Sequence, residues 1–254
     1  MTRRSDPAEP GITRRRRGRG FSYHHPDGRP VRDRRILARI RKLAIPPAWR
    51  EVWICRDPDG HLQAVGTDSA GRRQYRYHDD WREKQDRLKF DRVTELAARL
   101  PAFRRRVAAD LAGSDLTRDR VLAAAARMLD LGLFRAGGAE YDSFGLATLR
   151  TEHVTCDAER VRCRYDGKGG KPVETEIRDP AVCRVISALL DVGPGELLRY
   201  RDGSGWRDVR AEDVNDYLRE HLGEEVSAKD FRTWHATVVA AAALARAPRS
   251  RSRT

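Results

Sequence analysis

The stretch Leu131-Gly-Leu-Phe-Arg-Ala-Gly-Gly-Ala-Glu-Tyr141 decides the fold of the larger part of this chain. Apolar residues at spacings of three and four precede it and predict a helix over Arg118–Leu131. Gly132 stands where a helix C-terminal glycine is expected, so the chain leaves the helix there. Arg135 follows, next to flexible glycines, in a setting that suits clamping a phosphate with paired N–H donors. The alternative is an ordinary surface arginine after a helix, and the rest of the chain must decide.

The segments that follow this stretch alternate between helices and short strands. Strands are predicted at residues 153–157, 160–166 and 172–177, and the last two are joined by the exposed turn Gly167-Lys168-Gly169-Gly170-Lys171. A lysine in such a turn is often merely solvated. Helices are predicted at residues 90–111, 180–192, 211–222 and 227–245. Ser227 is a natural N-cap of the last helix, with Asp230 as a capping-box partner, so Arg232 lies near a helix N-terminus that favours anions.

The segment before residue 87 predicts a smaller, mostly β domain. Residues 34–43 have helical spacing, and strands at 52–55 and 61–65 are joined by the hairpin signal Asp57-Pro-Asp-Gly60. In the next strand, alternation places Gln74, Arg76 and His78 on one face and Tyr75 and Tyr77 on the other. Interleaved aromatic and arginine side chains can stack, bind phosphate and read base edges, but an edge strand with amphipathic tyrosines gives the same pattern.

Charge and composition limit the function classes. The net charge is +13, but seven arginines lie within residues 1–20 and four within residues 245–254, so we expect two disordered basic ends. The four cysteines show no paired spacing, so we expect free thiols, no metal site and a reducing compartment. No apolar run is long enough to span a membrane. We therefore expect a cytoplasmic, nucleoid-associated monomer whose partner is a polyanion.

Three short motifs occur in order along the larger domain. They are Phe134-Arg135-Ala-Gly, Gly167-Lys168-Gly-Gly-Lys and Lys229-Asp-Phe-Arg232-Thr-Trp. Together they resemble the type IB DNA topoisomerases, in the compact poxvirus-like form found in bacteria, and the catalytic module is similar to that of the tyrosine recombinases. The smaller domain resembles the same family in Ile45-Pro-Pro-Ala-Trp49, Gly60-His-Leu-Gln-Ala64 and Gly71-Arg-Arg-Gln-Tyr-Arg-Tyr-His78. The resemblance covers roughly residues 20–244.

The resemblance implies a role for each matching residue. Members of the family attack one phosphate of duplex DNA with a tyrosine, form a 3′-phosphotyrosyl link and reseal the strand after rotation, without metal, nucleotide or other cofactor. Arg135 and Arg232 match the two arginines that neutralise the reacting phosphate, and Lys168 matches the lysine that protonates the departing 5′-oxygen. Lys229 falls where the recombinases have a histidine, so it is a possible auxiliary in that proton transfer. The resemblance also implies DNA contacts by Gln74, Tyr75, Tyr77 and Tyr141.

One departure from the family pattern concerns the nucleophile. The family tyrosine follows the helix of Arg232, whereas the last tyrosine here is Tyr217. His235 belongs to the Arg-Thr-Trp helix and does not replace the missing family histidine. The change from apolar helix to an Arg/Ser/Pro-rich end after Ala245 favours a frameshift or truncation over a natural short paralogue.

These observations predict an α+β fold. We expect a disordered arm at residues 1–20, an antiparallel β domain at 21–86, a mainly helical catalytic domain with a three-stranded antiparallel sheet at 87–245, and a basic tail at 246–254. The predicted function is that of a type IB topoisomerase by descent, lacking its nucleophile. The alternatives are a non-catalytic clamp for duplex DNA and, less favoured by the first domain, a strand-specific recombinase.

Overall fold

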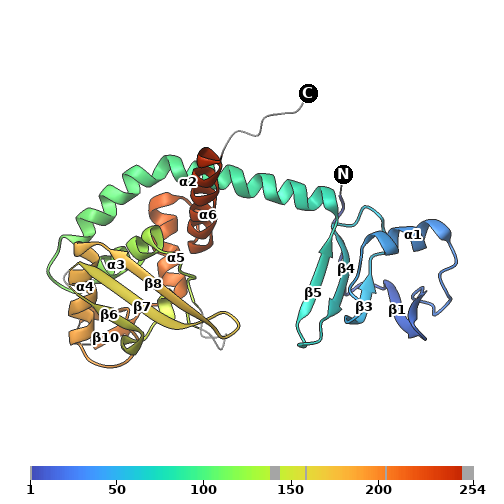
Figure 1. The fold of residues 1–254 in the computed structure, drawn as a ribbon, viewed down its shortest axis with the longest axis horizontal. Coiled ribbons are helices and arrows are strands. Elements are labelled where there is room, and N and C mark those ends of the chain that lie inside the picture. Colours follow the sequence, from blue (N-terminus) through green and yellow to red (C-terminus); the bar gives the residue numbers. More distant parts are fainter. Residues whose placement is uncertain (1, 138–143, 158, 204, 248–254) are drawn as a thin grey trace. The chain divides into compact units, whose positions relative to one another are not determined.

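The structure is a computed structural model, and it describes residues 2–137, 144–157, 159–203 and 205–247. The chain divides into two compact units, Met1–Lys89 and Phe90–Thr254, called here the N-terminal and the C-terminal unit. The boundary falls inside one long helix, α2 (Asp79–Leu111), which Figure 1 shows in green and turquoise. The sequence placed the boundary three residues earlier, between residues 86 and 87.

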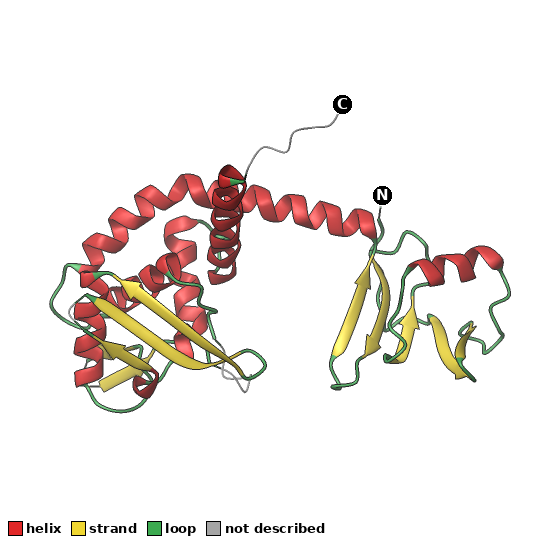
Figure 2. Ribbon diagram, viewed as in Figure 1, coloured by secondary structure: helices red, strands yellow, loops and turns green. Residues whose placement is uncertain are grey.

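The N-terminal unit contains an antiparallel sheet with the strand order β2-β1-β3-β4-β5 (Figure 2). Its strands are β1 (Ile12–Arg17), β2 (Gly20–His24), β3 (Arg50–Ile54), β4 (Leu62–Thr67) and β5 (Arg73–Tyr77). Helix α1 (Arg34–Lys42) begins at Asp33, whose carboxylate accepts two backbone N–H bonds. Apolar side chains of α1 and of one sheet face form the core of this unit, which includes Ile12, Ile40, Ile54 and Ala64.

The prediction of a disordered arm over residues 1–20 is wrong, because this segment contains β1, which lies between β2 and β3 in the sheet. Strand β1 pairs with β2 through a tight turn at Gly18, whose φ of 56° suits glycine, and with β3 on its other side. The Arg14 side chain donates to the carbonyls of Ile45, Pro46 and Trp49 and lies 4.1 Å above the ring of Phe21. A prediction from composition treats arginines as solvated charges. Whether a strand forms depends instead on hydrogen bonding to the neighbouring strands and on apolar side chains packed in the core.

The C-terminal unit is mainly helical. After α2 come α3 (Arg118–Leu131), α4 (Pro180–Asp191), α5 (Ala211–Leu222) and α6 (Ala228–Arg246), together with short 3-10 turns at Leu146–Thr148 and Thr151–His153. A three-stranded antiparallel sheet contains β6 (Val154–Cys156), β7 (Arg160–Gly167) and β8 (Lys171–Arg178) in that order. The α+β fold class and the small sheet are therefore confirmed. The hairpin of β9 (Arg199–Asp202) and β10 (Gly205–Asp208) was not predicted.

Helix α3 occupies the centre of this unit. All residues from Val121 to Ala126 are fully buried, so apolar neighbours surround the helix on every side. Near its end, the buried carboxylate of Asp130 accepts two bonds of 2.8 Å from Arg104 and one of 3.2 Å from Arg127. A buried carboxylate is tolerated only when its oxygens are paired in this way. The end of α3, from which the Arg135 segment leaves, is thereby fixed against α2.

None of the helices within the described residues combines the length and the apolar character that crossing a membrane requires.

Candidate active site

Close packing holds the segment that carries Arg135. Helix α3 ends at Leu131, and Gly132 has an extended backbone with φ −127°, so it is not the left-handed C-terminal glycine that the sequence predicted. Glycine is required there because a Cβ would lie 2.6 Å from the ring of Phe134, which is fully buried. The Phe134 ring therefore fixes the segment, and the next side chain, Arg135, is exposed.

The backbone of Arg135 is held from its other side by the segment after residue 143. Leu146 donates its N–H to the carbonyl of Arg135 at 2.8 Å, and Ala147 donates to Ala136 at 2.7 Å. Gly145 packs so closely that its Cβ would lie 2.5 Å from the Cα and N of Gly137. The guanidinium of Arg135 thus extends from a backbone that is held on both sides.

Arg232 reaches this segment from α6. The helix begins at Ser227, whose N–H and hydroxyl both bond the Asp230 carboxylate, which confirms the predicted capping pair. Asn215 of α5 accepts the N–H of Ala228 at 3.0 Å. Arg232 lies in the second turn, is half-buried, and donates to the carbonyl of Leu133, two residues before Arg135.

Arg135 lies close enough to Arg232 for its charge to affect the pKa of Arg232. The pKa of Arg232 is lowered, first by burial and second by the positive charge of Arg135. Burial raises the pKa of Tyr165 to about 12, and both arginines oppose that rise. Among the ion pairs of the described residues, neither guanidinium has a carboxylate partner. Two adjacent cations that have no counter-ion in the described part of the chain form a site suited to an anion.

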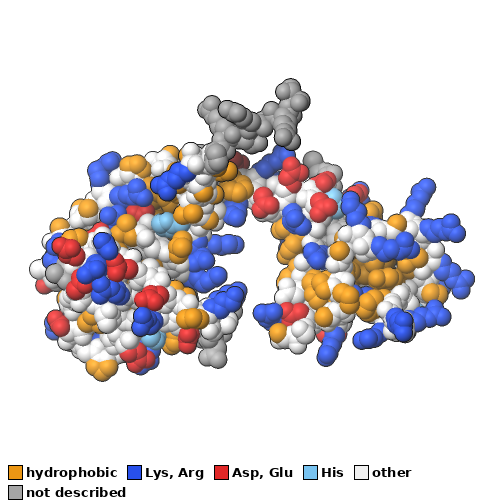
Figure 3. Space-filling view, viewed as in Figure 1, with side chains coloured by type: hydrophobic (Ala, Val, Ile, Leu, Met, Phe, Trp, Pro, Cys, Tyr) orange, Lys and Arg blue, Asp and Glu red, His pale blue; other side chains and the backbone are white. Residues whose placement is uncertain are grey.

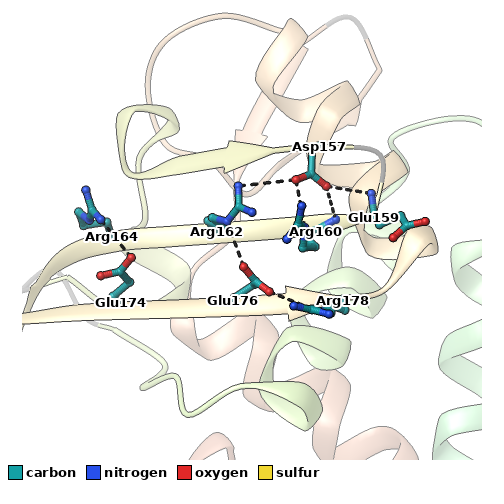
Figure 4. A network of polar contacts seen from close by, with 8 residues as sticks. All are labelled: Asp157, Glu159, Arg160, Arg162, Arg164, Glu174, Glu176 and Arg178. Carbon is teal, nitrogen blue, oxygen red and sulfur yellow. Dashed lines mark hydrogen bonds and ion pairs between the residues drawn. The ribbon is translucent and has the colours of Figure 1, made fainter.

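Lys168 lies at the tip of the β7–β8 hairpin. The turn contains Gly169 and Gly170, both with positive φ, and Lys168 is exposed. Cross-strand ion pairs hold the two strands in register on their solvent face, with Arg162 3.0 Å from Glu176 and Arg164 3.0 Å from Glu174 (Figure 4). Each exposed ion pair contributes little to stability. Opposite charges at directly facing positions nevertheless avoid the repulsion that two like charges would cause there.

The inner face of the hairpin connects it to the Arg135 segment. Tyr165 stacks on Phe134 with ring centroids 6.4 Å apart and planes inclined by 12°. The backbone carbonyl of Asp166 accepts the N–H of Phe144 at 2.9 Å. Tyr165 and Phe134 were not predicted as site residues, although the alternating buried positions of β7 put Tyr165 on its inner face. The structure thus brings Arg135 and Arg232 together, and Lys168 lies in the turn after β7, the strand whose Tyr165 stacks on Phe134.

The remaining predicted site residues are Lys229, Gln74, Tyr75, Tyr77 and Tyr141. Lys229 is exposed in the first turn of α6, three residues before Arg232 and therefore on the same side of the helix. In the N-terminal unit, Gln74 and the pair Tyr75 and Tyr77 lie on opposite faces of β5, and the Gln74 amide donates to Asp68 at 2.9 Å. Tyr141 lies outside the described residues.

The structure also shows which tyrosines are inaccessible. Tyr217 is buried and donates its hydroxyl to Asp110 at 2.8 Å, and burial together with this bond raises its pKa. Tyr165 is only 7% exposed. A phenol that is buried and kept protonated cannot readily attack a phosphate. Within the described residues, no group of three or more His, Cys, Asp or Glu side chains is placed to hold a metal ion.

Comparison with known proteins gives matches to both units. Residues 20–68 match the family described as bacterial DNA topoisomerase IB, N-terminal domain, and residues 78–254 match eukaryotic DNA topoisomerase I, catalytic core. The chain is 31% identical over 251 residues to the DNA topoisomerase 1B of Acanthamoeba polyphaga mimivirus, an alignment that covers 95% of this chain and 75% of the viral protein. The two family matches follow the order of the two units along the chain.

Proposed function

The chain belongs to the type IB DNA topoisomerases, and we propose that it binds duplex DNA and holds one backbone phosphate between Arg135 and Arg232. The observation that carries the proposal is the contact between the two segments, in which Arg232 donates to the Leu133 carbonyl while its pKa is lowered by the charge of Arg135. Two guanidinium groups that have no carboxylate partner among the described residues match the charge that develops on a phosphate under attack.

The other site residues have roles that follow from their chemistry. The Lys168 ammonium, on an exposed turn, would protonate the departing 5′-oxygen, and Lys229 would assist from the same side of α6 as Arg232. The proposed reaction conserves the energy of the cut bond in a 3′-phosphotyrosyl link, so it requires neither ATP nor a metal ion. Tyr75 and Tyr77 would contact DNA from the N-terminal unit, together with Gln74 at the opposite face of β5.

The identity of the nucleophile leads to a second candidate function. Because Tyr165 and Tyr217 are buried and Tyr217 is bonded to Asp110, neither is placed for attack. We therefore propose that residues 1–254 on their own bind duplex DNA without cutting it. A non-catalytic DNA-binding protein that retains the phosphate-binding arginines fits the same observation.

Duplex binding at several salt concentrations tests the proposal. If about five phosphates are neutralised, log K should fall against log salt with a slope of about −4 to −5, in EDTA as well as in magnesium. Arg135→Ala and Arg232→Ala should each reduce the slope by about 1, whereas Arg105→Ala, at an exposed position of α2, should leave it unchanged. Binding that does not depend on salt, or an equal effect of all three substitutions, would contradict the proposal.

We also propose that the protein is a monomer in the cytoplasm, associated with the nucleoid. The proposed substrate, chromosomal DNA, is located there. Fluorescent tagging should show the protein over the nucleoid, and sedimentation should give the mass of a single chain. A uniform distribution away from DNA, or a stable dimer, would contradict this part of the proposal.

A further inference from the structure

The first residues of the chain are fixed to the N-terminal unit, upstream of the family match that begins at residue 20. Arg3 forms a parallel bridge with Gly60, because its N–H donates to the backbone carbonyl of Asp59 at 2.8 Å and its carbonyl accepts the backbone N–H of His61 at 2.7 Å. Two residues on, the Ser5 hydroxyl donates to the carbonyl of Leu62 and accepts its N–H. The backbone of Arg3 is therefore paired with the segment just before β4, and the Ser5 side chain is bonded to the first residue of β4, so the backbone is held on both sides of Arg4.

A hollow of about 410 Å³ lies where these residues meet the first turns of α2. Arg3, Arg4 and Lys84 supply positive charge around it, His61 and Trp81 supply rings, and none of the described residues that line it is acidic. Arg3 approaches the carboxylate of Asp57 at 3.7 Å, but its side chain is 76% exposed, so this pair is weak and open to exchange. The hollow is therefore suited to phosphate groups that remain in contact with solvent.

A row of aromatic rings connects this hollow to the predicted DNA-contact tyrosines. Tyr75 stacks on Tyr77 with centroids 6.2 Å apart, and Tyr77 stacks on Trp81 at 4.4 Å. His61 lies 5.6 Å from Trp81, and its Nδ1 accepts the N–H of Ser5 at 3.0 Å, which fixes the ring. Figure 3 shows Lys and Arg side chains projecting from this unit beside exposed hydrophobic surface. Cations that continue a row of partly exposed aromatic rings favour an extended polyanion over a small ligand.

We propose that Arg3, Arg4 and Lys84 form a second contact site for the phosphate backbone of duplex DNA, continuous with Tyr75 and Tyr77 through Trp81. The inference rests on the proposed DNA binding and adds a site that the family matches do not assign. Trp81 acts as a positioning residue, because it supports Tyr77 and borders the cations.

The test measures the salt dependence of duplex binding by the full chain carrying Arg3→Ala, Arg4→Ala and Lys84→Ala together. Loss of three phosphate contacts should make the slope of log K against log salt shallower by about 2 to 3. The matched control replaces Arg34, Arg35 and Arg41, three exposed arginines of α1, and changes the net charge equally. We expect the control to keep at least two thirds of the original slope. The backbone bonds of Arg3 and the bonds of Ser5 do not need the substituted side chains, so the melting temperature should not change.

The outcomes distinguish this site from the proposed function. Salt-dependent binding of the unmodified chain, with equal slopes for the triple variant and the α1 control, overturns the second site and leaves the proposed function standing. Absence of any binding overturns both. If the triple variant fails to fold, acetylation footprinting of the unmodified chain decides: DNA should protect Lys84 more than Lys42, and equal labelling with and without DNA overturns the site. Competition by inorganic phosphate at concentrations too low to act as salt would show a small-anion pocket instead.

Discussion

Replacing Gly145 by alanine tests whether close packing holds Arg135 in position. A Cβ at Gly145 would lie 2.5 Å from the Cα and N of Gly137 and 2.9 Å from the carbonyl oxygen of Arg135. Non-bonded carbon atoms are in favourable contact at about 3.5–4.0 Å, so the backbone next to Arg135 must move by about 1 Å. The atoms that clash belong to the backbone, so no rotamer change can absorb the displacement.

We expect effects of this substitution on both stability and DNA binding. Overpacking should cost about 1–3 kcal/mol and lower the melting temperature of the C-terminal unit by about 2–4 °C per kcal/mol. A displaced Arg135 should also make the salt slope of duplex binding shallower by about 0.9, as Arg135→Ala does. Combining Gly145→Ala with Arg135→Ala should change the slope no further, since both remove the same contact.

Differential scanning calorimetry and binding titrations at several salt concentrations provide the two readouts. Gly205→Ala is the matched control, because a Cβ there has no heavy atom within 4 Å. If Gly145→Ala melts and binds like Gly205→Ala, the packing of Gly145 against Gly137 does not position Arg135, and the reasoning is refuted.

Three further predictions follow from the structure. Deleting residues 1–17 should unfold the N-terminal unit rather than only weaken DNA binding, because β1 lies between β2 and β3; a native circular dichroism spectrum after deletion would contradict this. Burial raises the pKa of Cys163 from 9.0 and that of Tyr165 from 10.0, each to about 12. As the pH rises, the unfolded chain loses these protons before the folded chain does, so the free energy of unfolding should fall between pH 9 and 12 by about 1.4 kcal/mol per pH unit for each ionising group. Cys163→Ala should make the plot of unfolding free energy against pH less steep. A flat plot for the unmodified chain would refute this prediction. Trypsin should cut first between Arg82 and Arg92, where α2 is largely exposed, and DNA should slow that cut; first cuts within residues 120–180 would count against the unit boundary.

Much of the fold could be predicted from the sequence because periodicity reports burial. The helix of residues 118–131, the capping pair of Ser227 and Asp230, and the β7–β8 hairpin all have local patterns. Strand β1 was missed because four consecutive arginines look solvated, whereas Arg14 is bonded to three carbonyls. Strands β9 and β10 were missed because their residues are mostly charged and exposed.

The candidate site was predicted less completely. The resemblance identified Arg135 and Arg232, but their proximity depends on a bond between residues 99 positions apart, from Arg232 to Leu133. Sequence patterns contain no signal for such a contact. The support of Arg135 by Phe134, Tyr165 and Gly145 is likewise a property of packing between separate elements. Many glycines of this sequence have open space around them in the folded chain, and nothing in the sequence distinguishes Gly145, which packs closely against Gly137, from these.

The central claim, that Arg135 and Arg232 act together on one DNA phosphate, is tested most directly by cleavage kinetics. The substrate is duplex DNA in EDTA, and the enzyme is this chain joined after about Ala245 to a tyrosine-bearing C-terminal segment of a related topoisomerase. The account predicts that Arg135→Ala and Arg232→Ala each slow cleavage by about 10²–10³, that the double variant is little slower, and that residues 1–254 alone form no covalent DNA adduct. Undiminished cleavage by either variant, or an adduct on Tyr165 or Tyr217 of the unmodified chain, would contradict it.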